Sequence, residues 1–317
     1  MARIRVRLPI KSLGWVNSYL IGSALIDPGM AWGRSLLDLS RGLAEAGVSP
    51  CSLESVVVTH FHVDHSTAST MVYYISGARL YIGEGDLKVI RGGVEEYIGS
   101  ALQLYQEAGM PKEEVEEIRM SHPALRLRDV YEEAASLDWR PLQEGDTIDL
   151  GGARAEVLEA PGHTPGHILL KLPGERLIVG DTLLPGITPH VTIHNWRDDP
   201  LGWYMESLSR IAGIGASVAY PGHRDPIQDP AGRAREILEH HKSRLAEVLG
   251  LLREGPLAGY DVARRIKWRT RYSSWEEYPA PERFFAMGEA LAHIRRLEVE
   301  GLVEEVDLGG VKGWRLA

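Results

Sequence analysis

The stretch Thr59-His60-Phe61-His62-Val63-Asp64-His65 places three imidazoles and one carboxylate within seven residues. It follows Val56-Val57-Val58, a short β-branched run that predicts a buried strand. His60 and His62 are two residues apart, so an extended backbone directs both side chains to one side. Imidazole and carboxylate are the usual ligands of a hydrolytic zinc ion. The stretch therefore predicts a metal site where the chain leaves the strand.

Three further apolar runs predict strands, and each of them stops at residues of ligand type. These residues are His163 and His167 in Pro161-Gly162-His163-Thr164-Pro165-Gly166-His167, Asp181 after Leu177-Ile178-Val179-Gly180, and His223 after Val218-Ala219-Tyr220-Pro221-Gly222. A glycine lies close to each of them, which lets the backbone turn tightly beside a crowded site. Several strand ends are thus expected to deliver ligands to one place, enough for more than one metal ion.

These motifs, in this order, resemble those of the metallo-β-lactamase-fold hydrolases, and the resemblance covers roughly residues 1–230. It implies an α/β protein built as an αββα sandwich that holds two metal ions. The ligands that it implies are His60, His62 and His163 for the first metal, Asp64, His65 and His223 for the second, and Asp181 as a bridge between the two. The ligand types favour zinc, and iron or manganese also suits sites to which carboxylates contribute.

The aspartates of these motifs have different expected roles. Asp181 is expected to bridge the metals, and Asp64 to accept a hydrogen bond from the nucleophile as well as to bind metal, so these two are the predicted catalytic residues. Asp27, in Ala24-Leu25-Ile26-Asp27-Pro28-Gly29, matches an early aspartate of the family that orders the metal loop and does not bind metal. An ordinary turn aspartate is the alternative, because Asp before Pro-Gly is typical of turns.

Several histidines lie outside the implied ligand set. His190 and His194 lie in the loop after Asp181, where either is expected to contact substrate or donate a proton, with a plain loop histidine as the alternative. His167 is expected either to support the metal site or to pack. Surface or packing roles are expected for the remaining ones, which are His122, His240, His241 and His293.

The composition is that of a globular enzyme of 317 residues, long enough for a large core and an extra module. There is no run of 18 apolar residues, and the N-terminus alternates like a strand without the apolar centre of a signal peptide. Cys51 is the only cysteine, so no intrachain disulfide is possible. A cytoplasmic location without a membrane partner is therefore expected. Only two Asn and four Gln residues are typical of a thermophile.

Two regions differ from the strand-rich remainder. Residues 86–138 are charged with helical spacing and indicate a helical insertion in the core domain. In residues 232–317 the pattern predicts helices over 234–252, 259–268 and 281–300, followed by strands at 302–306 and 311–316. We therefore expect a catalytic domain at 1–231 and a winged-helix-like domain at 232–317. This order is similar to that of the lactamase-like hydrolases with a C-terminal winged helix, of which one branch, the lactamase-β-like-two proteins, includes endoribonucleases.

The C-terminal module contains one candidate nucleic-acid segment. Residues 263–272 are basic and interleave two aromatic side chains, a pattern that suits phosphate contact and base stacking. Yet residues 235–317 hold 14 basic and 14 acidic side chains, and the whole chain has a formal net charge of −9. A strongly basic footprint is therefore absent. The module is expected to act as a lid or a homodimer contact, and RNA stays the alternative partner.

The motifs predict a dinuclear-metal-dependent hydrolase that uses a metal-bridged hydroxide. His62 stands where oxygen-reducing diiron relatives carry a carboxylate, which favours hydrolysis over redox chemistry. The expected substrate is a small ester or thioester, because the chain is acidic and its last module is neutral. An endoribonuclease or phosphodiesterase acting on single-stranded RNA is the alternative, since both reactions need the same hydroxide and Lewis acid. A non-catalytic metal-binding module is the third hypothesis, and it requires a complete ligand set with no open coordination position.

Overall fold

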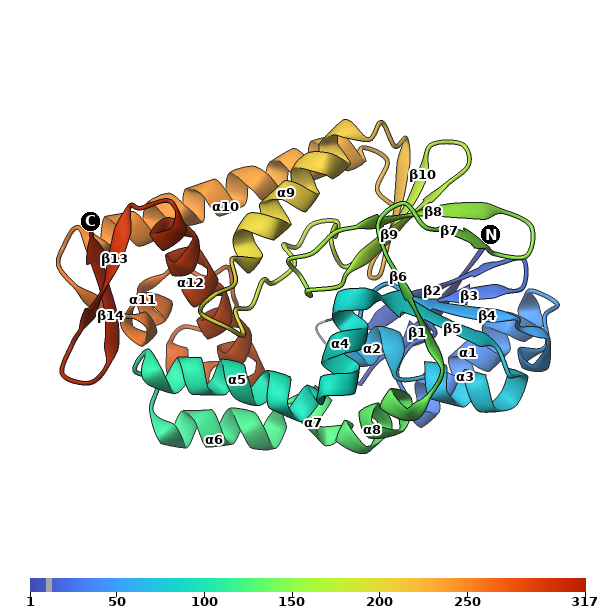
Figure 1. Cartoon of the computed structure of the whole chain (residues 1–317), viewed down its shortest axis with the longest axis horizontal. Helices are drawn as coiled ribbons and strands as arrows, with labels where there is room; N and C mark the ends of the chain where they lie inside the picture. Colours follow the sequence, from blue (N-terminus) through green and yellow to red (C-terminus); the bar gives the residue numbers. More distant parts are fainter. Residues whose placement is uncertain (10–12) are drawn as a thin grey trace.

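Two β-sheets lie face to face in the part of the chain that carries the predicted ligands (Figure 1). The computed structural model describes residues 1–9 and 13–317. The first sheet contains, in spatial order, β1 (Ala2–Arg7), β2 (Trp15–Ile21), β3 (Ala24–Ile26), β4 (Ser55–Val58), β5 (Arg79–Gly83) and β6 (Trp139–Leu142). The second contains, in spatial order, β11 (Val218–Pro221), β10 (Arg176–Gly180), β9 (Ile168–Leu172), β8 (Arg154–Glu159) and β7 (Thr147–Asp149). Both sheets mix parallel and antiparallel pairs.

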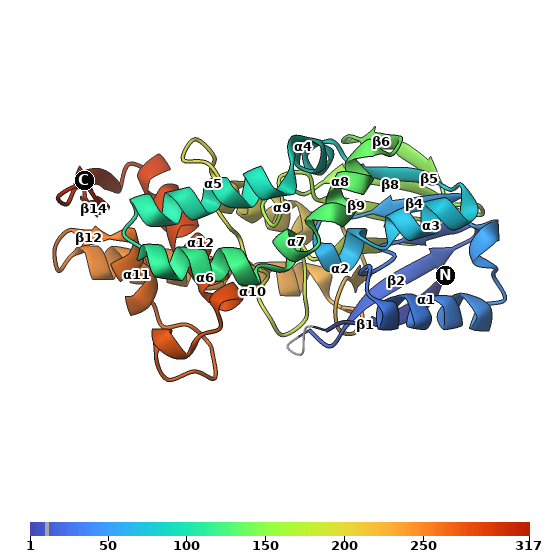
Figure 2. The ribbon, with the colours of Figure 1, turned by 90° about the horizontal axis from the view of Figure 1, so that it is seen from below.

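The predicted strand at 56–58 lies in the middle of the first sheet as part of β4, which pairs in parallel with β3 and β5. Val57 packs between the two sheets, while Val56 and Val58 pack on the outer, helix-covered side. Burial on both faces explains why the apolar run is continuous rather than alternating. Helices α1 (Gly33–Glu45) and α3 (Ser69–Ser76) cover that outer face (Figure 2). The layers are those expected of the α/β sandwich.

Helices fill the chain between β5 and β6, where a helical insertion is predicted. They are α4 (Glu84–Gly92), α5 (Val94–Glu107), α6 (Lys112–Ser121), α7 (Pro123–Arg126) and α8 (Arg128–Ser136). The second sheet is covered on its outer side by α9 (Pro200–Gly213) and by the first part of α10 (Pro230–Leu252) (Figure 1). None of the helices in the described ranges is long and apolar enough to cross a membrane.

The C-terminal segment follows the predicted order of helices and strands. It contains α10, β12 (Leu257–Ala258), α11 (Gly259–Arg265), α12 (Ala280–Val299), β13 (Val303–Asp307) and β14 (Lys312–Leu316), and the strands form a small antiparallel sheet. Helix α10 begins with Pro230, and the Asp229 side chain accepts a hydrogen bond from the Gly232 N–H at 2.8 Å. The expected domain boundary at 231/232 therefore falls inside the first turn of this helix.

The C-terminal segment packs against the helices that follow β5 (Figure 2). Glu114 of α6 is the main polar link, because its carboxylate accepts hydrogen bonds from Trp275 Nε1 at 3.0 Å and from the Arg283 guanidinium at 2.8 Å. Tyr260 donates its hydroxyl to the same carboxylate, and Glu117 also pairs with Arg283. Three elements of the C-terminal segment are thereby tied to one helix, which fixes α12 in place.

Candidate metal centre

The seven predicted ligands meet at one end of the two sheets. His60 and His62 lie in the loop after β4, and Asp64 and His65 lie in the short helix α2 (Val63–Ser66). The loops after β8, β10 and β11 provide the remaining ligands, which are His163, Asp181 and His223. Segments far apart in the sequence thus converge, because strands of both sheets end at the same edge of the sandwich.

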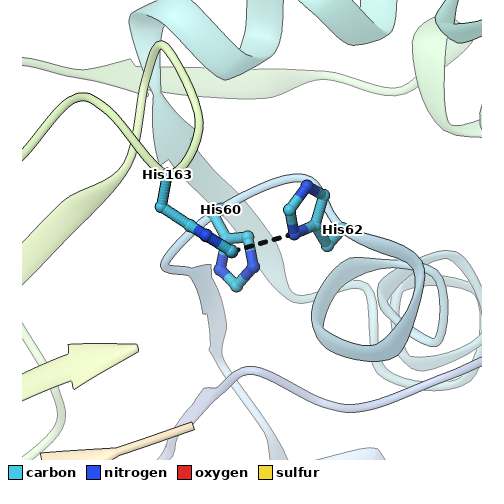
Figure 3. A group of neighbouring side chains, drawn as sticks. All are labelled: His60, His62 and His163. Carbon is cyan, nitrogen blue, oxygen red and sulfur yellow. Dashed lines mark hydrogen bonds between the residues drawn. The ribbon is translucent and has the colours of Figure 1, made fainter. Parts of the chain in front are cut away.

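The ligands form two groups in which one ligand atom of each residue lies within 4.8 Å of the others, and a third group of the same kind links them. The two groups are His60, His62 and His163, and Asp64, His65 and His223, and the linking group is His60, His65 and Asp181. Figure 3 shows the first group, in which His163 Nε2 lies 3.1 Å from His62 Nδ1. In the second group His223 Nε2 lies 3.2 Å from Asp64 Oδ2. The arrangement follows the division into two metal positions that the family resemblance implies.

Asp181 reaches both groups with its two oxygen atoms. Oδ1 lies 3.5 Å from His65 Nε2, and Oδ2 lies 3.4 Å from His223 Nε2 and 4.0 Å from His163 Nε2. A carboxylate between two sets of imidazoles is the geometry that a bridging ligand requires. No other carboxylate of the described residues is grouped with both sets.

The unpaired atoms of this cluster fit metal ions. Nε2 of His60, of His65 and of His223 and Oδ1 of Asp181 are buried and have no hydrogen-bond partner among the described residues. A buried polar atom without a partner costs about 1–3 kcal/mol. Four such atoms in one cluster would therefore destabilise the fold unless a cation satisfied them. The donor set of five imidazoles and two carboxylates suits zinc.

The second nitrogen of several ligand histidines is held from behind. His65 Nδ1 donates to Asp27 at 2.9 Å, His223 Nδ1 to the Trp15 carbonyl at 2.7 Å, and His163 Nδ1 to the His190 carbonyl at 2.9 Å. These acceptors hold a proton on Nδ1, so Nε2 faces the centre and offers its lone pair once it carries no proton of its own. The imidazoles are therefore oriented as ligands before any metal binds.

Asp27 lies where the family's early aspartate is implied to act. Its carboxylate accepts the Thr59 N–H and the Thr59 hydroxyl, both at 2.7 Å, in addition to His65. The residue has φ of 50°, an uncommon value for a side-chain-bearing residue. Asp27 thus joins the end of β4 to α2, and the turn interpretation alone does not account for these bonds.

His167 and Gly222 shape the position of Asp181. His167 Nε2 accepts the Asp181 N–H at 3.1 Å, and its ring stacks on His60 with centroids 4.9 Å apart, so it supports the site. A Cβ atom on Gly222 would lie 2.3 Å from Asp181 Oδ1 and 2.4 Å from the His65 ring. Only glycine leaves room there for the two side chains to approach.

Asp86 connects two ligand loops and was not predicted from the sequence. This buried carboxylate accepts the Phe61 N–H at 2.8 Å, the Thr164 hydroxyl at 2.8 Å and the Gly166 N–H at 2.6 Å. Burial raises the pKa of Asp86 to about 7, against the lowering effect of these hydrogen bonds. Asp86 follows an apolar strand that ends at Gly83, just as the predicted ligands follow strands. This position is the feature of the sequence that could have indicated its role.

The variant Asp86→Ala is expected to weaken metal binding by about 10–100-fold, the usual effect of removing a group that positions ligands. Without the carboxylate, the loops carrying His60, His62 and His163 lose their common anchor. Chelator competition would measure the affinity. Glu84→Ala is the matched control, because Glu84 is a partly buried residue of the same helix that pairs with Lys88 and bonds to neither ligand loop among the described residues. Equal affinities in Asp86→Ala and the wild type would contradict the anchoring role.

The charges of the centre balance one another. Burial alone would lower the pKa of His223, but the Asp181 and Asp64 carboxylates raise it to about 10. Burial alone would raise the pKa of Asp181, but the charges of His223 and His65 hold it well below its usual range. Protonated imidazoles therefore neutralise the carboxylates, and because metals bind neutral imidazole, metal binding is expected to release protons.

The two histidines predicted to contact substrate have different surroundings. His190 stacks on His62 with centroids 5.5 Å apart and lies 4.0 Å from the ring of Phe285 in α12, so it belongs to the site. His194 stacks on Tyr97 at 3.7 Å and donates Nδ1–H to the Tyr97 carbonyl at 3.1 Å. Within the described ranges, neither a hydrogen bond nor a ring contact joins His194 to a predicted ligand.

The family model described as "Metallo-beta-lactamase superfamily" matches residues 13–223, which include all seven predicted ligands. The chain belongs to this superfamily. The match covers every strand of both sheets except β1 and every loop that contributes to the centre, and it confirms the resemblance inferred from the motifs. Together with the buried His/Asp cluster, it identifies the chain as a metal-dependent hydrolase.

Relatives extend the similarity beyond the superfamily model. "Probable metallo-hydrolase YqjP" of Bacillus subtilis is 26% identical over 321 residues, covering 94% of this chain and 92% of the relative. The Drosophila melanogaster beta-lactamase-like protein 2 homolog is 26% identical, covering 92% of this chain and 84% of its own length. The crystal structure of the metallo-beta-lactamase family protein TTHA1429 from Thermus thermophilus is 29% identical with a TM-score of 0.82, and the alignment covers 100% of this chain and 98% of that one. The C-terminal segment is therefore shared with these proteins.

Proposed function

We propose that the chain hydrolyses a small carboxylic ester or thioester at a centre of two metal ions, with zinc as the favoured metal. The observation that carries the proposal is the pair of three-residue ligand groups with Asp181 between them. When bound, the two ions supply Lewis acidity and lower the pKa of a water molecule towards 7. The ligand groups hold His and Asp side chains only, which suits zinc, with iron or manganese as alternatives.

The protein's own residues provide orientation and proton transfer. The Asp64 carboxylate lies 3.2 Å from His223 Nε2. Burial alone would raise the pKa of Asp64, but the charges of the neighbouring imidazoles outweigh it and lower the pKa. An ionised Asp64 can accept a hydrogen bond from the attacking water and so orient it. His190, one ring away from His62 and His163, can orient the substrate carbonyl or donate a proton to the leaving group.

An aromatic wall beside the centre supports the small acyl substrate. Phe285 projects from α12 onto His190, and Phe284 of the same helix packs inward against Tyr105. The C-terminal segment thereby contributes directly to the rim of the site. The Phe285 ring, which is the one of the two that faces His190, suits an apolar acyl group better than a charged phosphodiester.

Two of the five basic side chains in the segment at 263–272 are paired with acidic ones. Arg264 pairs with Glu276 at 2.6 Å, and Arg265 lies 3.8 Å from Glu254. Trp268, one of the interleaved aromatics, donates Nε1–H to a backbone carbonyl and carries the Arg244 guanidinium on its face at 4.6 Å. These contacts engage Arg264, Arg265 and Trp268, whereas no ion pair of Lys267, Arg269 or Arg271 is found among the described residues, so these three are the cations left for phosphate contact.

We also propose that residues 232–317 form a winged-helix-like domain, as predicted. Three helices and a three-stranded sheet in the order β12-β14-β13 support this topology. In a helix-turn-helix the second of the paired helices enters the nucleic-acid groove. Here that helix is α12, whose residues are largely buried against neighbouring helices, including Arg283 and His293. The domain is therefore better suited to packing on the catalytic core than to nucleic-acid binding.

A substrate screen with the zinc-loaded enzyme tests the proposal. It would compare acyl esters and thioesters with bis-p-nitrophenyl phosphate and single-stranded RNA. Phe285→Ala is expected to lower kcat/KM for the best acyl substrate about tenfold, or about 1.4 kcal/mol. The double variant Arg269→Ala/Arg271→Ala is the control and is expected to leave acyl hydrolysis unchanged. Faster cleavage of RNA than of any ester, with salt-sensitive binding lost in the double variant, would establish the alternative.

A further inference from the structure

A further group of ligand-type side chains lies between α10 and α12, outside the centre described above. His240 and His241 of α10 and Glu289 of α12 each offer one ligand atom within 4.8 Å of the others. The ligand atoms within each group of the metal centre are equally close to one another. Two imidazoles and one carboxylate form a common zinc donor set that leaves one coordination position open. None of the three lies within residues 13–223, which match the superfamily model.

A chain of hydrogen bonds fixes the orientation of His241. His293 Nδ1 lies 2.7 Å from the Glu289 carbonyl oxygen, so it donates, and His293 Nε2 is left as an acceptor. His241 Nδ1 lies 3.2 Å from that atom and must donate to it. The lone pair of His241 is therefore on Nε2, which is buried and has no partner in the described ranges. Metal-binding histidines are typically held in this way through their second nitrogen.

The Glu289 carboxylate is also without a partner. No hydrogen bond or ion pair to it is found among residues 1–9 and 13–317. Burial raises the pKa of this carboxyl to about 7, although the Arg244 charge lowers it. The Glu289 side chain is only partly buried, so its carboxylate keeps some contact with water, but no donor of the described residues meets it. One cation between α10 and α12 would satisfy Glu289 and His241 together.

We propose that His240, His241 and Glu289 bind a third zinc ion. Zinc–nitrogen bonds of about 2.0–2.1 Å place tetrahedral ligands about 3.4 Å apart, so the side chains must close by up to about 1.4 Å. His240 is only partly buried and has room to turn. The ion would tie α12 to α10 at the residue one helical turn after Phe285. It would therefore rigidify the aromatic wall of the active site.

Tyr204 and Arg244 lie beside the proposed third site. The ring of Tyr204 meets that of His241 edge to face at 5.5 Å, and its hydroxyl donates to the Thr182 carbonyl, next to Asp181, at 2.8 Å. Arg244 brings a positive charge that opposes the ion. Its guanidinium is paired with Glu247 at 3.0 Å, which offsets part of that charge. The third site is therefore expected to bind zinc more weakly than the main centre and to fill after it.

Anomalous diffraction at the zinc edge, with zinc added in excess to crystals of the whole protein, tests the proposal. A peak between His240, His241 and Glu289 is expected in addition to those at the main centre. Glu289→Gln should remove this peak alone, and equilibrium dialysis should show one zinc fewer per chain. Glu298→Gln is the matched control, because Glu298 lies on the same helix and, in the described part of the chain, its ion pair is with Arg295.

A second variant protects the test against misfolding. His240→Gln changes a partly exposed residue and should also lose one zinc, and zinc should raise the thermal midpoint of either variant less than that of the wild type. The proposal fails if the third position stays empty while the main centre is full, or if its peak persists in Glu289→Gln. An empty main centre in the same map would instead count against the proposed hydrolase, so the two failures are distinguishable.

Discussion

Asp181→Ala is expected to abolish hydrolysis and to lower the metal content, with the fold retained. Its oxygens lie 3.4 Å from His223 Nε2 in one ligand group and 4.0 Å from His163 Nε2 in the other, so they are the negative charge shared by both ligand groups. Two unit charges about 4 Å apart interact by about 4 kcal/mol at an effective dielectric of about 20, and divalent ions repel more strongly. Without the bridge, a loss of roughly 10³-fold or more in kcat is expected, about 4 kcal/mol.

Elemental analysis and turnover of the best acyl substrate would measure both effects, with circular dichroism to verify folding. Asp129→Ala is the control, because Asp129 is an exposed residue of α8 whose ion pair, among the described residues, is with its neighbour Arg128. That variant should keep wild-type turnover and metal content. Wild-type turnover in Asp181→Ala would rule out the bridging role.

The ligand set could be predicted because every ligand lies shortly after the end of a strand. A β-branched run and the residues directly after it are local in the sequence, so the spacing of His60, His62, Asp64 and His65 already contains the geometry. The order of the motifs then implied which ligands share a metal. The structure brings these same residues together in overlapping groups, and which of them share a metal stays a prediction.

Asp86 could not be predicted by the same logic. Its three partners are Phe61, Thr164 and Gly166, which are 25, 78 and 80 residues away, so its role exists only once two loops have met. His190 and His194 show the same limit. Both lie in one loop, and the path of that loop decides that one ring faces His62 and the other faces Tyr97.

Helix α12 shows what the spacing of apolar residues predicts and what it does not. The predicted apolar positions Phe284, Met287, Leu291, Ile294 and Leu297 are all buried. The spacing does not show that the neighbouring face, with Phe285 and Glu289, points to the active site and to α10. That information depends on how the C-terminal segment docks, which is a property of contacts between distant elements.

Removing the Glu114 side chain is expected to have the largest effect on stability. In the sequence it belongs to the run Glu113-Glu114-Val115-Glu116-Glu117-Ile118, which is typical of a solvated helix face. In the structure it is the common acceptor for Arg283, Trp275 and Tyr260. The Arg283 side chain is only 8% exposed. Removing one partner of a buried ion pair costs about 3–5 kcal/mol, because the other charge is left uncompensated.

Glu114→Ala is therefore expected to lower the free energy of unfolding by about 3 kcal/mol, at the low end of that range because Glu117 still pairs with Arg283. Urea unfolding would measure it. Glu113→Ala, on the adjacent exposed position of the same helix, should change stability by less than about 0.5 kcal/mol. Adding Arg283→Met to Glu114→Ala should recover most of the loss, since the unpaired charge is then gone.

The same variant links the docking of the C-terminal segment to catalysis. If Glu114 holds α12 in place, then Glu114→Ala should also raise KM for an acyl substrate, because Phe285 lies two residues after Arg283 and contacts His190. Metal content should stay at the wild-type level, since none of the seven ligands lies on α6. A loss of stability below about 1 kcal/mol would show that other contacts fix α12. A normal KM despite the full loss would show instead that Phe285 reaches the site without help from this ion pair.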